Sequence, residues 1–211
     1  MLPFAVSTDT EENPSMSPKI DEPTIVEQRA MRQRQLIDAA MSLALEGGAP
    51  SVTVAAVAKR AGISRTLVYE YFSSSADLIA DLVMEELDYY CNRLAVAVKE
   101  ENDPERYLEL WIEEALSYVA DGRHMLVKSL NSVATPEYRR GDIGIAHKKL
   151  MSTIILPLEK MGLSNIQIAV SLLQSTIDNA SVRIDGGNEA ALEIQYAQKY
   201  AIAGLRALAT H

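Results

Sequence analysis

Several features that define large classes of protein are missing from this sequence of 211 residues. Cys91 is its single cysteine, which excludes an internal disulfide and a cysteine-rich zinc site. No apolar run approaches the ~20 residues that span a bilayer. The chain also does not open with a basic segment followed by an apolar core, as a secretory signal would. We therefore expect a cytoplasmic protein that does not bind a membrane.

Motifs of enzymes and metal sites are also lacking. The sequence contains no G-x-S-x-G motif, no phosphate-binding loop and no zinc-protease helix. His124 and His147 lie far apart, with no third ligand at a suitable spacing, so we expect no metal ion. The acidic pair Glu85-Glu86 is interpreted as part of a solvated helix face. We expect neither enzymatic activity nor a cofactor.

Basic residues are scarce, and the formal net charge is -9. The deficit is uneven along the chain. Residues 1–26 hold one lysine and five acidic residues, residues 76–211 hold 13 basic and 20 acidic residues, but residues 27–75 hold six basic and four acidic ones. This middle segment alone has the sign of charge that suits nucleic acid, while the acidic remainder would discourage non-specific binding to DNA.

The net-basic segment contains two short helical stretches separated by a glycine. Val54–Ala61 favours a helix and stops at Gly62, which suits a tight turn. Ser64 then offers a side-chain oxygen to cap a second helix. On this helix the expected exterior residues are Arg65, Thr66, Tyr69 and Tyr71, and the expected interior residues are Val68 and Phe72. The pattern predicts a helix-turn-helix that reads DNA in the major groove, and hence a sequence-specific regulator.

The periodicity of the whole chain predicts an all-α protein in three parts. Residues 1–26, which contain four prolines, are expected to be a disordered arm. Residues 27–75 are expected to form a three-helix DNA-binding domain over Glu27–Glu46, Val54–Ala61 and Arg65–Phe72. Residues 76–211 are expected to form a larger helical domain, entered through a long connector helix.

Further helices are expected in this larger domain at the positions where caps and breakers frame an apolar period. The connector should run from about Asp77 to Glu101. The expected helices that follow are Glu105–Ala120, His124–Val133, Tyr138–Met161 with a kink at Pro157, one that begins after Asn165, and Glu189–Ala209.

The last helix has a wider apolar arc than one core-facing stripe requires, so it should be buried on two sides. Burial inside a monomer and burial against a second subunit both fit this arc. One recognition helix reads only a few base pairs, and helix-turn-helix proteins commonly bind two half-sites. We therefore expect a homodimer formed by the last two helices. The expected interface residues are Leu172, Leu173, Ile177, Tyr196, Tyr200 and Leu205.

The run from Ser51 to Ile79 resembles the amino-terminal signature of TetR-type transcriptional regulators. The matching parts are Thr53, Ala61-Gly62-Ile63-Ser64, Val68-Tyr69-Glu70-Tyr71-Phe72, Ser74 and Asp77-Leu78. The resemblance implies a homodimeric repressor that binds a palindromic operator in double-stranded DNA. It also implies that a small molecule bound in the carboxy-terminal domain moves the connector helix and releases the DNA.

The resemblance implies DNA contacts for particular residues. Thr53 would hold a phosphate at the start of its helix, and Arg65 would read guanine. The full set expected to contact DNA is Thr53, Val54, Ser64, Arg65, Thr66, Leu67, Tyr69, Tyr71 and Ser75. The sequence departs from the family pattern twice: Ser75 stands where a phosphate-binding lysine is usual, and Thr66-Leu67 stands where Gly-Thr is common.

The resemblance places the effector pocket among the central helices of the larger domain. The candidate lining residues are Tyr107, Trp111, Tyr118, Met125, His147 and Met151. A second hypothesis is a small-molecule-binding helical protein whose DNA recognition is weakened or lost, which Ser75 and the overall acidity favour. A third, an all-α enzyme, has no motif behind it.

Overall fold

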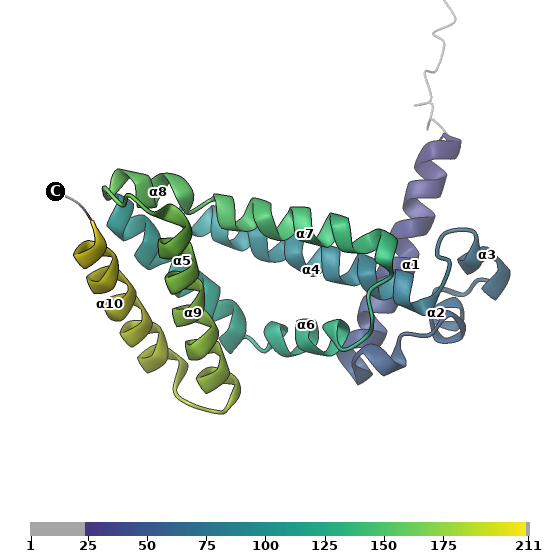
Figure 1. Ribbon diagram of the computed structural model, residues 1–211. Helices are drawn as coiled ribbons and strands as arrows, with labels where there is room; N and C mark the ends of the chain where they lie inside the picture. The colour runs from purple at the N-terminus through teal and green to yellow at the C-terminus, as the bar shows by residue number, and fades with distance from the viewer. Residues whose placement is uncertain (1–23, 210–211) are drawn as a thin grey trace, which may run out of the picture.

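The computed structural model describes residues 24–209, which are helical except for turns and one isolated antiparallel bridge between Leu163 and Ala209 (Figure 1). The predicted all-α fold class is thereby confirmed. The elements are α1 (Ile25–Gly47), the short 3-10 helix η1 (Ala49–Ser51), α2 (Val54–Ala61), α3 (Arg65–Tyr69), α4 (Ser75–Ala97), α5 (Pro104–Ala120), α6 (Arg123–Asn131), α7 (Glu137–Ser152), α8 (Ile155–Lys160), α9 (Ile166–Asp185) and α10 (Ala190–Leu208).

Helix α1 begins two residues earlier than predicted because Thr24 forms a capping box. The Thr24 hydroxyl accepts a hydrogen bond from the Glu27 N–H at 3.2 Å, and the Glu27 carboxylate accepts one from the Thr24 N–H at 2.7 Å. The expected arm of residues 1–26 was therefore drawn too long, since its last two residues lie in α1. Residues 1–23 lie outside the described residues.

A small core joins α1, α2 and α3 to the beginning of α4. Its fully buried side chains include Leu36, Val57, Val68 and Phe72. The same core continues beyond residue 75, where a domain boundary was expected, because the first half of α4 contributes Leu78, Ile79, Leu82 and Val83 and helix α6 contributes Leu126 and Leu130. The amino-terminal unit is thus built on α4 and rests against α6.

A second, larger core lies at the other end of α4. It packs the end of α4 against α5, α8, α9 and α10. Trp111 and Leu108 of α5 are buried at its centre, and Leu94 marks the point where α4 enters it. Helix α4 therefore contributes to two separate cores.

Two predicted helices are wrong in extent. The stretch Tyr138–Met161 is not one kinked helix but two, because the chain turns at Thr153 and starts α8 at Ile155. Pro157 is then the third residue of α8, where its missing N–H has no intrahelical partner to lose. Helix α3 ends at Tyr69 rather than at Phe72, and the turn that follows directs Phe72 into the small core.

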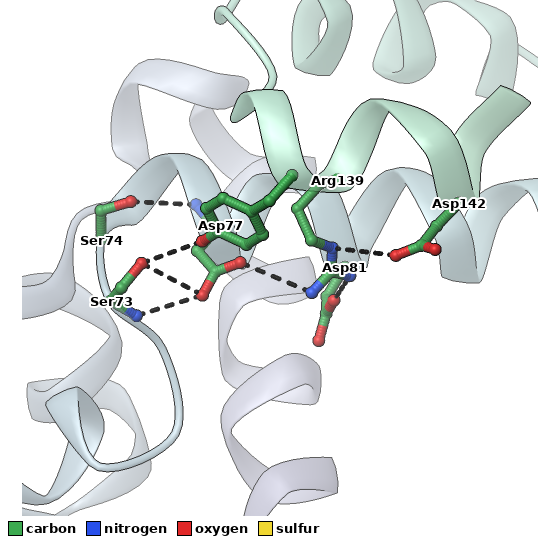
Figure 2. Close-up of polar contacts among 7 residues, drawn as sticks. Ser73, Ser74, Asp77, Asp81, Arg139 and Asp142 are labelled. Atoms are coloured by element: carbon green, nitrogen blue, oxygen red, sulfur yellow. Dashed lines mark hydrogen bonds and ion pairs between the residues drawn. The ribbon is translucent and has the colours of Figure 1, made fainter.

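Helix α7 lies along α4 and is tied to its first turns by an arginine (Figures 1 and 2). The Arg139 guanidinium forms ion pairs with Asp77, at 3.5 Å, and with Asp81. Its Nε is buried without a hydrogen-bond partner, 3.8 Å from the Asp142 carboxylate. We call Arg139, Asp77 and Asp81 the clasp. It joins the larger domain to the residues that begin α4.

The clasp continues into the loop that leads from α3 to α4. Asp77 accepts a hydrogen bond from the Ser73 N–H at 3.1 Å, and its own N–H donates to the Ser74 hydroxyl at 3.2 Å (Figure 2). The Ser73 and Tyr138 hydroxyls are 3.0 Å apart, so α7 also reaches this loop directly. A displacement of α7 would therefore also displace the loop that follows α3.

Two glycines interrupt α7 between the clasp and its carboxy-terminal half. A Cβ added to Gly141 or Gly144 would meet no atom within 4 Å, so no close packing requires glycine at either position. Because glycine lowers helix stability, α7 is intrinsically weak at this place.

We predict opposite effects for two glycine substitutions that both enter open space. Gly141→Ala should raise the free energy of unfolding by about 0.5–1 kcal/mol, because alanine is the better helix former. Gly62→Ala should lower it, since Gly62 has a φ of 69° and ends α2 in the left-handed region. Urea unfolding followed by circular dichroism measures both. A destabilising Gly141→Ala would show that the helix needs this glycine.

The clasp should behave as a coupled ion-pair network. Arg139→Gln and Asp81→Asn should each destabilise the protein, and the double variant should lose less than the sum, with a coupling energy of about 1 kcal/mol or more. The same cycle with Arg106→Gln and Glu109→Gln is the control, because that pair is exposed on α5 and should show almost no coupling. Equal coupling in the two cycles would contradict the prediction.

Candidate DNA-binding surface and effector cavity

Helices α2 and α3 are framed by local hydrogen bonds that their sequence provides. The Thr53 hydroxyl accepts from the Ala56 N–H at 3.1 Å and caps α2. Gly62 adopts the left-handed conformation and ends it. The Ser64 hydroxyl accepts from the Leu67 N–H at 3.1 Å and caps α3. With Val68 buried beneath it, α3 is held as the second helix of a helix-turn-helix.

The outer face of α3 is open. Arg65, Thr66 and Tyr69 are exposed, and within residues 24–209 none of their side chains has a hydrogen-bond or ion-pair partner. Tyr69 leaves 58% of its surface exposed, which is unusual for a large aromatic residue on a small domain. Leu67 is half-buried. The face thus presents a guanidinium, two hydroxyls and a ring to any partner.

Tyr71 is held from α1, by a residue that the sequence-based prediction did not include. The Arg29 guanidinium lies 5.0 Å from the centre of the Tyr71 ring and donates to the Glu70 carbonyl at 3.5 Å. This contact brings a positive charge beside the recognition helix. The cluster of Arg29, Arg32 and Arg34 in the sequence was the available signal, but their distance in sequence from α3 concealed it.

Val54 and Ser75 do not fit their expected role as DNA contacts. The Val54 side chain is buried, and its N–H donates to the Ser75 hydroxyl at 3.2 Å. Ser75 is half-buried and connects the first turn of α4 to the first turn of α2. Each residue is the first of its helix, and the beginnings of α2 and α4 face each other rather than solvent.

Some basic residues of this domain are paired with a carboxylate and others are not. Arg60 is paired with Glu46 through two hydrogen bonds of 2.8 and 2.7 Å, and Arg34 is paired with Glu85 and Asp38. Among the residues described, the basic side chains of this domain without a carboxylate partner are Arg29, Arg32, Lys59 and Arg65. The uncompensated positive charge therefore gathers around α1, α2 and α3.

A cavity of about 480 Å³ lies between α4, α5, α6, α7 and α9. Of the six residues expected to line an effector pocket, Trp111, Tyr118, His147 and Met151 line this cavity. Tyr107 and Met125 do not. Tyr107 lies one turn before Trp111, where its hydroxyl donates to the Thr153 carbonyl at 3.2 Å, and Met125 is exposed because Leu126 takes the inward position on α6.

Glu86 is buried in the wall of the cavity, which corrects its interpretation as part of a solvated face. Its carboxylate accepts hydrogen bonds from the Arg123 guanidinium and, at 3.2 Å, from the Tyr118 hydroxyl. Burial and the Glu86 carboxylate both raise the pKa of Tyr118, so its phenol stays protonated. Glu85, its neighbour in sequence, does lie outside and pairs with Arg34.

The six expected interface residues separate into two groups because neighbouring positions on a helix point in different directions. Leu173, Ile177 and Leu205 are buried in the larger core, and Leu173 and Leu205 also line a groove between α9 and α10. Leu172, Tyr196 and Tyr200 are exposed. With Ile168, Val182, Leu192 and Leu208 they form an exposed apolar surface on α9 and α10, which we call the α9–α10 face.

Two searches of the described residues give no positive result. No helix among them is long and apolar enough to cross a membrane. No group of three or more His, Cys, Asp or Glu side chains in the same range is placed to hold a metal ion.

Residues 36–82 match the family of bacterial regulatory proteins of the tetR type. The fatty acid metabolism regulator protein of Bacillus subtilis is 25% identical over 123 residues, which are 58% of this chain and 61% of that protein. The HTH-type transcriptional regulator BetI of Brucella canis is 35% identical over 79 residues, which are 37% of this chain and 40% of that protein. The chain thus spans less than two thirds of either relative.

Comparison of folds extends the similarity over most of the chain. The crystal structure of the transcriptional regulator FadR from Bacillus subtilis, in complex with stearoyl-CoA, matches with a TM-score of 0.64 and 21% identity, and covers 81% of this chain and 98% of that one. At this identity the match shows a shared fold. Residues 36–82 thus match the tetR family of bacterial regulatory proteins, and most of the chain shares the fold of a solved transcriptional regulator.

Proposed function

We propose that this protein is a ligand-responsive transcriptional repressor that binds a palindromic operator as a homodimer and is released by a small molecule. The observation that carries the proposal is the open face of α3. Arg65, Thr66 and Tyr69 project from it without a partner among the residues described. A guanidinium can bond guanine through two hydrogen bonds, and a tyrosine ring can contact a thymine methyl or the backbone.

The charge around this face supports contact with DNA. Arg29, Lys59 and Arg65 keep their charge uncompensated by carboxylates, while the larger domain is acidic. Phosphate contacts from such residues position a protein on the duplex, and base contacts give specificity. The acidic domain is repelled by DNA, which favours an approach through α3.

The α9–α10 face supports a homodimer. It is apolar, and a groove of about 710 Å³ runs along it between Leu172, Tyr196, Tyr200 and Leu208. Exposed apolar surfaces of this kind usually mark an interface, and a two-fold axis through paired helices buries the same surface on both subunits. Two recognition helices related by this axis would match the two half-sites of a palindrome.

Helix α7 supplies a route for the response to a ligand. Its middle and its carboxy-terminal half line the cavity through Ile143, Gly144, His147 and Met151, and its first turn holds the clasp through Arg139. A molecule that enters the cavity would move α7, and the clasp would pass this movement to the beginning of α4. The ligand-bound fold relative from Bacillus subtilis supports the idea that such a protein takes a small molecule.

A second candidate function is a ligand-binding protein that has lost DNA recognition. One observation favours it: the first residue of the connector helix α4 is Ser75, a neutral side chain whose hydroxyl already bonds α2. Selection of the protein against duplexes with a random core distinguishes the two functions. Enrichment of a palindrome at moderate salt supports the repressor, and no enrichment supports the second candidate.

Substitutions on α3 should abolish recognition without unfolding the protein. We predict that Arg65→Ala and Tyr69→Ala each weaken binding to the enriched duplex by at least about tenfold, because each removes a contact with bases or backbone. The far-ultraviolet circular dichroism should not change, since both side chains are exposed. Arg106→Ala on α5 removes the same charge far from α3 and serves as the control. Unchanged affinity of both α3 variants, measured by fluorescence anisotropy at one salt concentration, would refute the proposed DNA-binding face.

The dimer should depend on the exposed half of the predicted interface. We predict that Tyr200→Glu raises the monomer–dimer dissociation constant by at least about tenfold, because it places a charge in an apolar interface. Val96→Glu, which changes an equally exposed residue on α4, should leave it unchanged. Sedimentation velocity over a concentration series measures both. A Tyr200→Glu variant that remains dimeric would place the interface elsewhere.

A further inference from the structure

The cavity has an unusual balance of charge, which narrows the class of ligand it can take. Its wall contains two carboxylates, those of Glu86 and Asp178, and neither a lysine nor an arginine. Glu86 is neutralised by Arg123, which lies outside the lining. Asp178 is an exposed residue with no ion-pair partner among residues 24–209, and its carboxylate accepts only from the Gln174 amide, at 2.8 Å. The imidazole of His147, which is an exposed residue, also lines the wall.

Aromatic side chains supply much of the remaining wall. Tyr90, Trp111 and Tyr118 all line the cavity, and the rings of Tyr90 and Tyr118 lie 4.6 Å apart. The Tyr90 hydroxyl has no hydrogen-bond partner among the described residues. Burial raises the pKa of Tyr90, so this ring remains a neutral phenol. Aromatic faces attract cations through their quadrupole, and more strongly in a site that is partly shielded from water.

Apolar side chains complete the site and define a second requirement. Leu87, Leu150 and Ile177 contribute hydrocarbon surface between the aromatic rings and the opposite helix. A ligand that fills about 480 Å³ must therefore carry a sizeable apolar body. An anionic head group would meet Asp178 with no basic side chain in the wall to offset the repulsion.

We propose that the effector is an amphipathic organic cation, whose apolar body fills the cavity and whose positive group lies between the aromatic rings and Asp178. This inference rests on the proposed function for the identity of the site but adds the chemistry of its ligand. The proposed ligand differs in charge from stearoyl-CoA, the ligand of the fold relative, which carries several phosphate charges. The cavity described here holds nothing that would pair with such phosphates.

The single tryptophan, Trp111, provides the measurement, because it lies in the cavity wall. The full-length protein is titrated with decyltrimethylammonium, decanol, decanoate and decanoyl-CoA, all below their micellar concentrations, while Trp111 fluorescence is recorded. We expect decyltrimethylammonium to bind at least about tenfold more tightly than each of the others. Equal or tighter binding of decanol, decanoate or decanoyl-CoA would overturn the proposal, as would the absence of any response to the cation.

A matched pair of variants separates the cavity from the general negative charge of the protein. Asp178→Asn should remove most of the preference for the cation and leave decanol binding unchanged. Asp88→Asn removes the same charge from an exposed position of α4 outside this wall and should preserve the preference. If both variants act alike, the preference comes from the net charge and the proposed site is wrong.

Adding the selected duplex distinguishes this inference from the proposed function. A cation that binds the cavity and releases the duplex supports both. A cation that binds with the expected preference but leaves DNA affinity unchanged supports the ligand class and contradicts the ligand response. A protein that enriches no duplex but prefers the cation supports the ligand class and the second candidate function.

Discussion

The two cores of this protein are connected through one helix, because α4 is buried at its beginning in the amino-terminal core and at its end in the larger one. Leu78 and Leu82 are fully buried in the first, and Leu94 is buried in the second. Close-packed interiors resist small displacements. A shift of the larger core along α4 therefore cannot be absorbed locally without opening one of the two interiors. The position of the helix-turn-helix is bound to that of the larger domain.

The clasp fixes how α7 is placed relative to α4. A half-buried ion pair adds little net stability because desolvation offsets its attraction, but removal of one partner leaves a charge without compensation. Arg139 holds Asp77 and Asp81, one turn apart on α4, so it fixes both the distance and the rotation of α7 relative to α4. The glycines of α7 lie immediately after it. The helix is thus firmly attached at one end and compliant in its middle.

The sequence was sufficient for the parts that depend on local patterns. Val54–Ala61 was predicted to the residue because Thr53 and Gly62 frame it, and the all-α class followed from the repeated helical period. The failures at the cavity and at the interface share one cause, which is that they depend on contacts between distant segments. Glu86 looks like half of a solvated acidic pair until Arg123 of α6 and Tyr118 of α5 reach it. Leu172 and Leu173 are adjacent in sequence, and only the packing of α9 decided which of them is exposed.

The structure gives a physical role to Ser75, which departs from the family pattern. A lysine at this place would add a charge whose contact with phosphate weakens as salt rises. The Ser75 hydroxyl instead bonds the Val54 N–H, which joins the first turn of α4 to the first turn of α2. The amino terminus of α2 carries the positive end of the helix dipole and suits a phosphate. In the proposed mechanism this terminus is attached directly to α4, so a movement of α4 displaces the beginning of α2 as well as α3. With serine at this position the chain lacks a salt-sensitive contact with DNA, and it has instead a hydrogen bond that joins α2 to α4.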